Sequence, residues 1–537
     1  MNLEKIYLFL LFVIVLMINL NSLNLPYYWD DFNYVIPAIN HVYNDNPTIF
    51  LWEQGLGHPP FLFILGGLTF KLFGDSPMVA HSIILIFSFL AVLFTYLLGK
   101  ELFSRKTGII ASLLLSFTPI FVSYSSLVYL EMPLTALVIM SVYFAVKNKP
   151  WPSIIFGSLA VLTKEIGILA VLGIFLAKFI KHRKAKTLIY GTPILVFLLL
   201  ITLNKIHYGD FIFPASSSLI NIFPIKNLVI IMAILKSLFF DQFRWVLSYL
   251  FIISLVSKDL FKKPKKQIIF ASILSLILLL MIFSLSFLNL ENYFQNINTY
   301  LSLLKKFSVI IITMFFLLIL NLKEFFNTYI RRELYELYFP ALLIIGTHFL
   351  IIPFPPRYIL PAYPLVFILF GFSVNKFFKR YAYLFTFLFI ILSISLFTGE
   401  RSGVGFTLEE NLEYRDFIEV RQNAADFISK NYPDSTVLVS YPMSMDLKHT
   451  YGKYVDDEIN VVTVSPFGYL TIKNYTEFLS LKNSNKEEIN LDEINLYYYS
   501  PQEFPIKNIY DARDKLNLTL IKKFEKNNKV TEIYLVN

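Results

Sequence analysis

The amino-acid sequence predicts a polytopic α-helical membrane protein that carries a soluble α/β domain at its carboxyl end. Three observations support this prediction: long apolar blocks, short basic loops that alternate with loops of mixed charge, and a change of composition near Thr398. Of 537 residues, 56% are hydrophobic and 16% are charged. A soluble chain of this length would be far less apolar, so most of the molecule is expected to lie in a membrane.

Long apolar runs predict the membrane spans. About 20 apolar residues cross a bilayer, and runs of that kind predict roughly thirteen spans. No small-residue cleavage site follows the first run, so we interpret it as a retained span rather than a signal peptide. The spans are placed at residues 4–22, 78–98, 107–123, 127–146, 152–166, 167–181, 187–204, 227–256, 267–289, 299–321, 336–353, 358–375 and 380–398.

The charges of the loops predict the orientation. If the amino terminus is cytoplasmic, six loops lie inside and all of them are basic: Lys100 to Lys106, Lys147 to Lys149, Lys178 to Lys186, Lys258 to Lys266, Lys323 to Arg332 and Lys376 to Arg380. The opposite loops are mixed in charge and rich in aromatic residues and proline. This is the positive-inside pattern of a multi-pass protein of the cell membrane, and it favours contact with anionic lipids over nucleic acid.

The segment from residue 399 to the carboxyl terminus has the composition of a soluble domain. Its net charge is about −6, against about +15 for residues 1–398. A helical pattern covers Tyr414 to Asn431, and β-like runs follow at 436–440, 459–464, 494–499, 518–524 and 530–536. An odd number of spans places this α/β domain outside the cytoplasm, on the side of the loop 23–77.

Acidic residues in the outer loop 23–77 are the first candidates for chemistry. Asp30 and Asp31 follow Tyr27, Tyr28 and Trp29, which an interfacial aromatic belt explains without any function. Carboxylates are costly at the edge of a bilayer, which favours a functional role. One of them is interpreted as a general base that deprotonates an attacking hydroxyl, and its neighbour as a group that orients the acceptor. A helix N-cap is the alternative interpretation.

Two further charged positions interrupt apolar runs on the same side. Glu131 begins a predicted span before Met132-Pro133, where it is either functional or a helix-start carboxylate that interacts with the dipole. Lys164 and Glu165 form a charged hairpin between two short spans. They either offset each other at the interface or, in the functional interpretation, Lys164 binds a substrate phosphate.

The remaining candidates lie in proline-containing turns. Arg357 and Tyr358 stand at an outer junction, where the planar guanidinium suits phosphate recognition, although an Arg–Tyr pair is also an ordinary interfacial anchor. His58, in Gly57-His58-Pro59-Pro60, is a structural residue, a donor to a phosphate or acceptor, or a metal ligand. The chain has no cysteine, which excludes disulfides, thiolate nucleophiles and cysteine-based zinc sites.

Six of these features, in this order, resemble a known family. They are the acidic pair, the His-Pro-Pro turn, the acidic residue before Met-Pro-Leu, the Thr-Lys-Glu hairpin, the Arg-Tyr-Ile-Leu-Pro start of a late span, and the outer tail. The pattern is similar to that of the GT-C fold glycosyltransferases, within them the protein O-mannosyltransferase and lipid A aminoarabinose transferase group. The resemblance covers about residues 1–400 and is looser in the tail.

The resemblance implies roles for individual residues. Asp30 matches the catalytic aspartate, and Asp31 stands where the family usually has glutamate. His58 matches the histidine of the His-Pro-Pro motif, but Phe61 to Phe63 occupy the place where the mannosyltransferase pattern continues to a lysine. That difference puts a protein acceptor in doubt and leaves the donor phosphate to Lys164 and Arg357, with Tyr358 beside them. Glu131, and Glu165 with His58, are expected to position acceptor or donor.

The expected function is therefore an inverting glycosyltransferase of the GT-C type. It would move a sugar from a dolichyl- or undecaprenyl-phosphate carrier to a hydroxyl of a glycan, lipid or protein on the outer membrane face. The oligosaccharyltransferase branch is set aside, because its Trp-Trp-Asp motif is missing. No cofactor is required in this mechanism, and a divalent metal is possible but not favoured. The alternative is a transporter or flippase of lipid-linked sugars, whose charges usually lie near the bilayer midplane.

Overall fold

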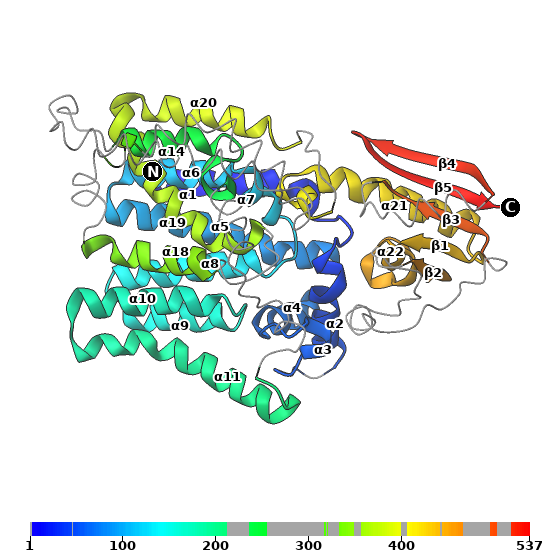
Figure 1. The fold of residues 1–537 in the computed structure, drawn as a ribbon, viewed down its shortest axis with the longest axis horizontal. Helices are drawn as coiled ribbons and strands as arrows, with labels where there is room; N and C mark the ends of the chain where they lie inside the picture. The colour runs from blue at the N-terminus through cyan, green and yellow to red at the C-terminus, as the bar shows by residue number, and fades with distance from the viewer. Residues whose placement is uncertain are drawn as a thin grey trace, which may run out of the picture.

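The computed structural model describes residues 3–45, 47–211, 236–254, 316, 317, 319, 332–347, 356–398, 405–440, 443–464, 494–501 and 517–537. A bundle of roughly parallel and antiparallel helices forms the larger part, and a β-sheet lies beyond one end of it (Figure 1). The amino-terminal helix begins near the opposite end of the bundle from the sheet. We call the end that carries the sheet the sheet end, and the opposite end the far end.

The helices of the bundle follow the predicted apolar runs. Within the described residues, four helical segments are long and apolar enough to cross a membrane: Glu4–Ser22, Pro77–Leu102, Ala185–Tyr208 and Arg357–Ile394. The predicted span 267–289, and 299–321 apart from three residues, lie outside the described residues. The bundle helices are α1 (Leu3–Asn19), α5 (Pro77–Leu102), α6 (Arg105–Ser116), α7 (Pro119–Tyr124), α8 (Glu131–Val146), α9 (Pro150–Val161), α10 (Gly167–His182), α11 (Thr192–Tyr208), α14 (Arg244–Ile253), α18 (Tyr335–Thr347), α19 (Tyr363–Phe378) and α20 (Ala382–Ile394).

Small residues allow the bundle helices to approach closely. A Cβ added at Gly108 of α6 would meet the Tyr96 carbonyl oxygen of α5, and one added at Gly173 of α10 would meet the backbone of Pro340 in α18. In lipid, the hydrophobic effect contributes little to the association of apolar helices. Close van der Waals contact between backbones of this kind therefore stabilises the helix pairs. The pairs α5–α6 and α10–α18 are therefore fixed at distances that larger side chains would not permit.

The predicted outer loop folds into short helices at the sheet end (Figure 1). A π-helical turn η2 (Asp31–Val35) leads into α2 (Ile36–Asn44), which is followed by α3 (Trp52–Gly55) and α4 (Phe61–Phe73). The helix α4 begins directly after the Pro59-Pro60 pair of the His-Pro-Pro turn. Its glycines let α2 lie directly on it, because a Cβ at Gly66 or Gly67 would collide with Ile39 or Val42.

A five-stranded mixed sheet with order β2-β1-β3-β5-β4 occupies the carboxyl-terminal part. The strand β1 (Val437–Ser440) is parallel to β2 (Val461–Val464) and to β3 (Leu496–Tyr499), whereas β5 (Lys529–Val536) is antiparallel to β3 and to β4 (Leu518–Lys526). The helix α21 (Glu413–Asn431) contacts β4 and β5, and α22 (Ser444–Lys448) contacts β2. Each strand overlaps one of the predicted β-like runs.

Aromatic residues join the carboxyl-terminal part to the outer loop. The ring of Phe32 lies 5.2 Å from that of Tyr451 and 6.1 Å from that of Tyr454. A Cβ on Gly452 would collide with the Phe32 ring, so only glycine permits this approach. The Tyr27 N–H donates to the Gly452 carbonyl at 3.2 Å. The backbone on either side of Asp30 is thus held by the segment that follows α22.

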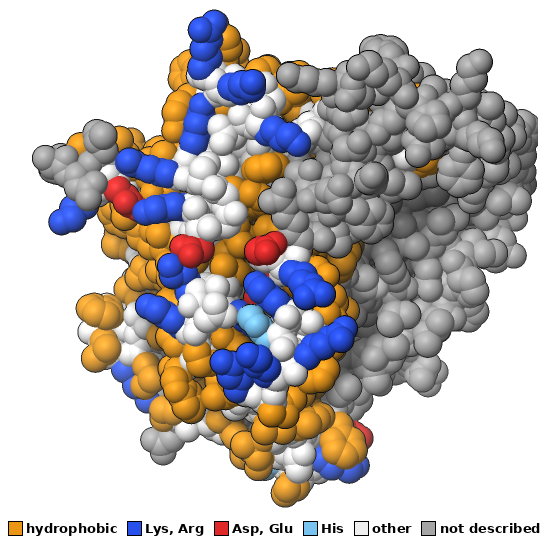
Figure 2. Space-filling model, turned by 90° about the vertical axis from the view of Figure 1, so that its left-hand side faces the viewer, with side chains coloured by type: hydrophobic (Ala, Val, Ile, Leu, Met, Phe, Trp, Pro, Cys, Tyr) orange, Lys and Arg blue, Asp and Glu red, His pale blue; other side chains and the backbone are white. Residues whose placement is uncertain are grey.

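The far end of the bundle is basic. Figure 2 looks onto this end and shows many Lys and Arg side chains set among apolar ones. Polar contacts tie its loops together: Lys147 pairs with Glu101 at 3.0 Å, and Lys178 donates to the Asn148 side chain at 2.8 Å. The predicted basic loops that the structure describes therefore gather at this end, away from the sheet.

Candidate functional site

Arg357 is the centre of a buried charged cluster at the sheet end. Its Nη2 lies 2.6 Å from Asp30 Oδ2, and its Nη1 lies 2.7 Å from Glu409 Oε2. Its Nε lies 3.6 Å from Glu131 Oε1. The Arg357 side chain is only 4% exposed. One guanidinium thus faces three carboxylates from parts of the chain that are far apart in sequence.

Lys164 completes the cluster on its other side. Its Nζ lies 2.6 Å from Glu131 Oε1, and both side chains are buried. The ammonium also lies over the ring of Tyr358, 4.4 Å from the centroid, where the ring face attracts a cation. Glu131 is the first residue of α8, and the positive end of the helix dipole favours a carboxylate there. We call these five residues, Asp30, Glu131, Lys164, Arg357 and Glu409, the charged cluster.

Local structure directs Asp30 toward this cluster. Trp29, just before it, has a positive φ of 48°, and the π-helical turn η2 follows at once. Such turns are rare and are frequent at functional sites. The Asp30 N–H donates to the Tyr129 hydroxyl at 3.3 Å, and the Tyr34 hydroxyl donates to Asp30 Oδ2 at 3.3 Å. Both the backbone and the carboxylate of Asp30 are therefore positioned by tyrosines.

Arg357 is positioned by a turn rather than by a long helix. It lies in the 3-10 segment η8 (Pro356–Ala362), which contains Pro361 and leads into α19. Proline fixes φ and removes a backbone donor, so this stretch resists incorporation into a regular helix. The guanidinium stacks near two tyrosine rings, at 5.0 Å from that of Tyr129 and 5.6 Å from that of Tyr358. The side chain is therefore enclosed by aromatic surface as well as by carboxylates.

Glu409 is a site residue that sequence reasoning missed. It lies in η10 (Gly405–Glu410) and is 1% exposed. The Tyr129 hydroxyl donates to its Oε1 at 2.5 Å, and the Tyr124 hydroxyl donates to its Oε2 at 3.0 Å. Burial raises the pKa of Glu409 to about 7, with Arg357 opposing the rise and Asp30 adding to it. An acidic residue just after the last apolar run was the one signal available in the sequence.

A second polar pair lies beside the charged cluster. His58 Nδ1 is 3.1 Å and 3.2 Å from the two carboxylate oxygens of Glu165. The ring of Tyr34, whose hydroxyl contacts Asp30, lies 5.4 Å from the His58 ring. The hairpin residues Lys164 and Glu165 thus have separate partners, Glu131 and His58. The alternative in which the two residues offset each other is therefore not what the structure shows.

Asp31 does not join its neighbour in the cluster. It is fully buried, its Oδ2 accepts from the Val128 N–H at 3.2 Å, and its Oδ1 has no hydrogen-bond partner among the described residues. Burial raises the pKa of Asp31 well above its usual range, with Glu409 and Asp30 adding to the rise. Of the predicted site residues, the structure therefore brings together Asp30, Glu131, Lys164, Arg357 and Tyr358, places His58 and Glu165 beside them, and leaves Asp31 apart.

In the described part of the chain, no three His, Asp or Glu side chains are grouped so that they could hold a metal ion. The cations that face the carboxylates of the cluster are those of Arg357 and Lys164.

The chain is similar to known proteins in part of its sequence and in its fold. Residues 57–207, less than half of the chain, match the family of dolichyl-phosphate-mannose-protein mannosyltransferases. No curated protein matches this chain. Among solved structures, apo ArnT from Cupriavidus metallidurans is 13% identical, with 99% of this chain and 98% of that chain covered and a TM-score of 0.50.

Two further solved structures are similar at lower TM-scores. ArnT from C. metallidurans bound to undecaprenyl phosphate is 12% identical, with 98% of this chain and 97% of that chain covered and a TM-score of 0.48. The oligosaccharyltransferase of Archaeoglobus fulgidus, in a complex with zinc and sulfate, is 14% identical, with coverages of 92% and 68% and a TM-score of 0.43.

These comparisons establish the fold and a family likeness for part of the chain. The match to apo ArnT confirms the prediction of a GT-C fold. The region 57–207, which contains His58, Glu131, Lys164 and Glu165, matches a glycosyltransferase family, as the order of the motifs indicated. Asp30, Arg357 and Glu409 lie outside the matched region, so their place in the site depends on the geometry described above.

Proposed function

We propose that this chain is an inverting glycosyltransferase that moves one sugar from a polyprenyl phosphate to a hydroxyl acceptor. The observation that carries the proposal is the 2.6 Å contact between Asp30 and Arg357, with the Lys164–Glu131 pair at its side. A proton acceptor and two cations converge there, and His58, Glu131, Lys164 and Glu165 belong to the stretch that matches a mannosyltransferase family. The carrier lipid is dolichyl or undecaprenyl phosphate.

The donor phosphate exchanges places with carboxylates of the cluster. Arg357 contacts both Asp30 and Glu409. A phosphate that forms two parallel hydrogen bonds with the guanidinium would displace one or both of these carboxylates. Lys164 supplies a second positive charge next to the same site. Donor binding therefore frees the Asp30 carboxylate at the moment when a base is needed, and Glu409 is the group most easily neutralised, since its pKa is near 7.

The reaction then needs one base and two cations. The acceptor oxygen attacks the anomeric carbon, and its proton passes to Asp30. The bond between that carbon and the phosphate oxygen breaks, and its electron pair remains on the lipid phosphate, whose charge Arg357 and Lys164 stabilise in a water-poor site. Attack from the face opposite the leaving group inverts the configuration. The mechanism requires no metal.

The distribution of charge supports an orientation with the far end in the cytoplasm, because the basic loops gather at that end and the positive-inside rule favours the cytoplasmic side for them. The charged cluster, the outer loop and residues 399–537 then lie outside the cytoplasm, where that last segment forms a separate α/β domain. The acceptor is a glycan, lipid or protein hydroxyl on this face of the cell membrane.

Substitution of Asp30 by Asn tests the proposal. Asn has the same shape but cannot accept the proton, so sugar transfer from a synthetic polyprenyl-phosphate sugar should fall by roughly 10²–10⁴-fold. Purified full-length protein would be assayed in detergent without any membrane gradient, with Asp416→Asn, an exchange of the same type on α21, as the control. Normal transfer by a correctly folded Asp30→Asn variant would refute the proposed base. A requirement for a gradient would favour a transporter.

A further inference from the structure

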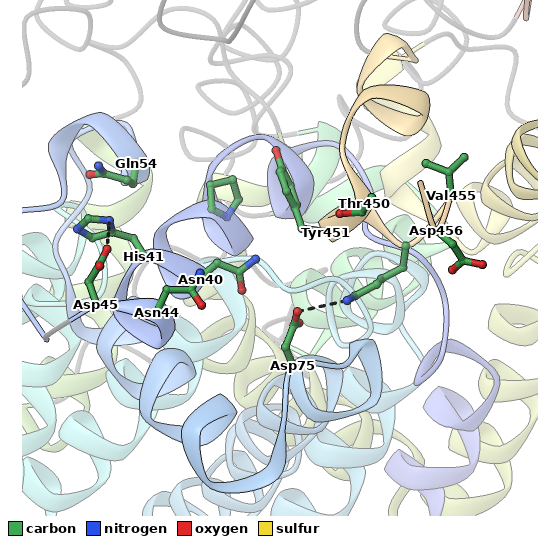
Figure 3. A pocket seen from close by; sticks show the side chains of 12 residues that line it. Asn40, His41, Asn44, Asp45, Gln54, Asp75, Thr450, Tyr451, Val455 and Asp456 are labelled. Carbon is green, nitrogen blue, oxygen red and sulfur yellow. Dashed lines mark hydrogen bonds and ion pairs between the residues drawn. The ribbon is translucent and has the colours of Figure 1, made fainter. Parts of the chain in front are cut away.

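A polar cavity lies apart from the charged cluster, between the outer loop and the carboxyl-terminal part. Its volume is about 700 Å³. One wall is α2 with Asn40, His41 and Asn44, and the facing wall is the segment 450–456 that follows α22. Figure 3 shows Asn40 and Asn44 between the His41–Asp45 pair on one side and Asp456 on the other. Gln54 of α3 and Asp75, after α4, complete the lining.

The lining is rich in groups that both donate and accept hydrogen bonds. Three carboxamides, Asn40, Asn44 and Gln54, line the cavity, and the ring of Tyr451 stands beside them. Each carboxamide offers two N–H donors and a carbonyl acceptor, which matches the paired donor and acceptor character of neighbouring sugar hydroxyls. The Tyr451 hydroxyl can donate to or accept from a sugar hydroxyl in the same way. This combination suits a carbohydrate better than an apolar ligand.

The charges of the lining select against anions. Asp45, Asp75 and Asp456 contribute carboxylates, whereas Lys453 is the lysine of the set and is already paired with Asp75. A phosphate or sulfate group would meet a surplus of negative charge, and like charges raise the free energy of binding. A neutral, hydroxyl-rich ligand satisfies the carboxamides and carboxylates without this penalty.

The cavity is connected to Asp30 through a rigid element. The helical stretch that begins at Asp30 runs without interruption through η2 into α2. At 1.5 Å per residue, Asn40 lies about 15 Å from Asp30 along this axis. A ligand that reaches from the cavity to Asp30 must therefore be longer than one sugar unit. We propose that this cavity binds the acceptor and that the acceptor is a neutral oligosaccharide; this inference rests on the proposed function.

A glycan array tests the cavity directly. Purified full-length protein in detergent would be applied to short neutral oligosaccharides, with sulfated oligosaccharides and short peptides on the same array. The wild type should be retained by neutral glycans, and the double variant Asn40→Ala/Asn44→Ala should bind them at least tenfold more weakly. The matched control is Asn423→Ala, which removes an exposed carboxamide on α21 outside the cavity.

A second measurement separates the two proposals. Hydrolysis of a synthetic polyprenyl-phosphate sugar without acceptor should be the same in the wild type, the double variant and Asn423→Ala, because none of these changes touches Asp30, Lys164 or Arg357. Three outcomes, each with normal donor turnover, would overturn the cavity proposal alone. The wild type could retain no glycan, it could retain peptides instead, or the double variant could bind glycans as well as the wild type does. Glycan binding without donor turnover would contradict the proposed function and leave the cavity as a glycan site.

Discussion

Both ends of the bundle bury a glutamate against cations, but the two clusters differ in the sign of their excess charge. At the far end, Lys178 and Lys181 surround Glu336, with Nζ to carboxylate distances of 2.9 Å and 3.1 Å. At the sheet end, Arg357 and Lys164 face three carboxylates. The far end has a fixed partner for its buried carboxylate, whereas at the sheet end Asp30 and Glu409 share one guanidinium.

This difference indicates what each cluster can do. Lys181 donates to both oxygens of Glu336, and Lys178 donates also to Asn148, so the far-end contacts are mutually satisfied. Such an arrangement fixes α10 against α18. Under the proposed function, an incoming donor phosphate replaces carboxylates at the sheet end, where Asp30 and Glu409 share Arg357. We therefore expect the first cluster to stabilise the bundle and the second to exchange partners.

The largest effect is expected when Glu336 is removed. Glu336→Leu leaves Lys178 buried without its carboxylate, and breaking a buried ion pair in this way costs on the order of 3–5 kcal/mol. The free energy of unfolding would be measured by denaturant titration in detergent. Glu333→Leu, an exposed residue in the segment just before it, is the matched control. The comparison of the two ends would break down if Glu336→Leu unfolded normally but lost sugar transfer.

The corresponding change at the sheet end should act on catalysis. Arg357→Lys keeps the charge but loses the planar fork that reaches Asp30 and Glu409 together, so kcat for transfer should fall by roughly 10²–10³-fold. Stability should change much less, because a cation remains in place. Lys181→Arg, a charge-conserving exchange at the far end, should leave kcat unchanged. Equal kinetic effects of the two exchanges would show that the ends do not differ in function.

A smaller effect is expected from the titration of Glu409. Its pKa is about 7 in the folded protein, against an ordinary 4.5, so the folded state holds a proton that the unfolded chain releases. This contribution to stability is complete below pH 4.5 and is lost as the pH rises through 7. Between about pH 5 and about pH 8, the wild type should therefore lose on the order of 2 kcal/mol more than Glu409→Gln.

The same titration should appear in donor binding. Protonation of Glu409 removes one competitor for Arg357, so the donor should bind more tightly below pH 7, and Glu409→Gln should abolish that dependence. Asp446, whose pKa burial raises to about 6, titrates in both proteins and cancels in the comparison. If the affinity for the donor changed with pH in the same way in the wild type and in Glu409→Gln, Glu409 would have to stay ionised.

The sequence predicted the cluster to the extent that topology determines it. Asp30 and Arg357 are 327 positions apart in the sequence. An even number of predicted spans separates them, so the predicted topology alone places both residues at the same end of the bundle. The lengths of the apolar runs likewise predicted most of the described helices. Both inferences rely on properties that the bilayer imposes on every such chain, and they need no knowledge of side-chain packing.

Side-chain direction was beyond that kind of inference. Adjacent residues on a helix differ in direction by about 100°, so the spacing of Asp30 and Asp31 alone does not say which carboxylate faces Arg357. Only the family resemblance pointed to Asp30. The π-helical turn and the tyrosines at 34 and 129 decide it. Glu409 was missed because its partner comes from another span, and the polar cavity because its two walls are distant in sequence. All three depend on tertiary contacts.

The smallest effect is expected from an exposed ion pair at the far end. Lys147 and Glu101 lie 3.0 Å apart, but their side chains are 34% and 39% exposed. Water screens such a pair and its long side chains lose conformational freedom, so Lys147→Ala should lower the free energy of unfolding only slightly. The decrease should disappear at high salt, because exposed pairs are screened. A loss as large as that of Glu336→Leu would mean that the far end is stabilised by its surface rather than by its buried glutamate.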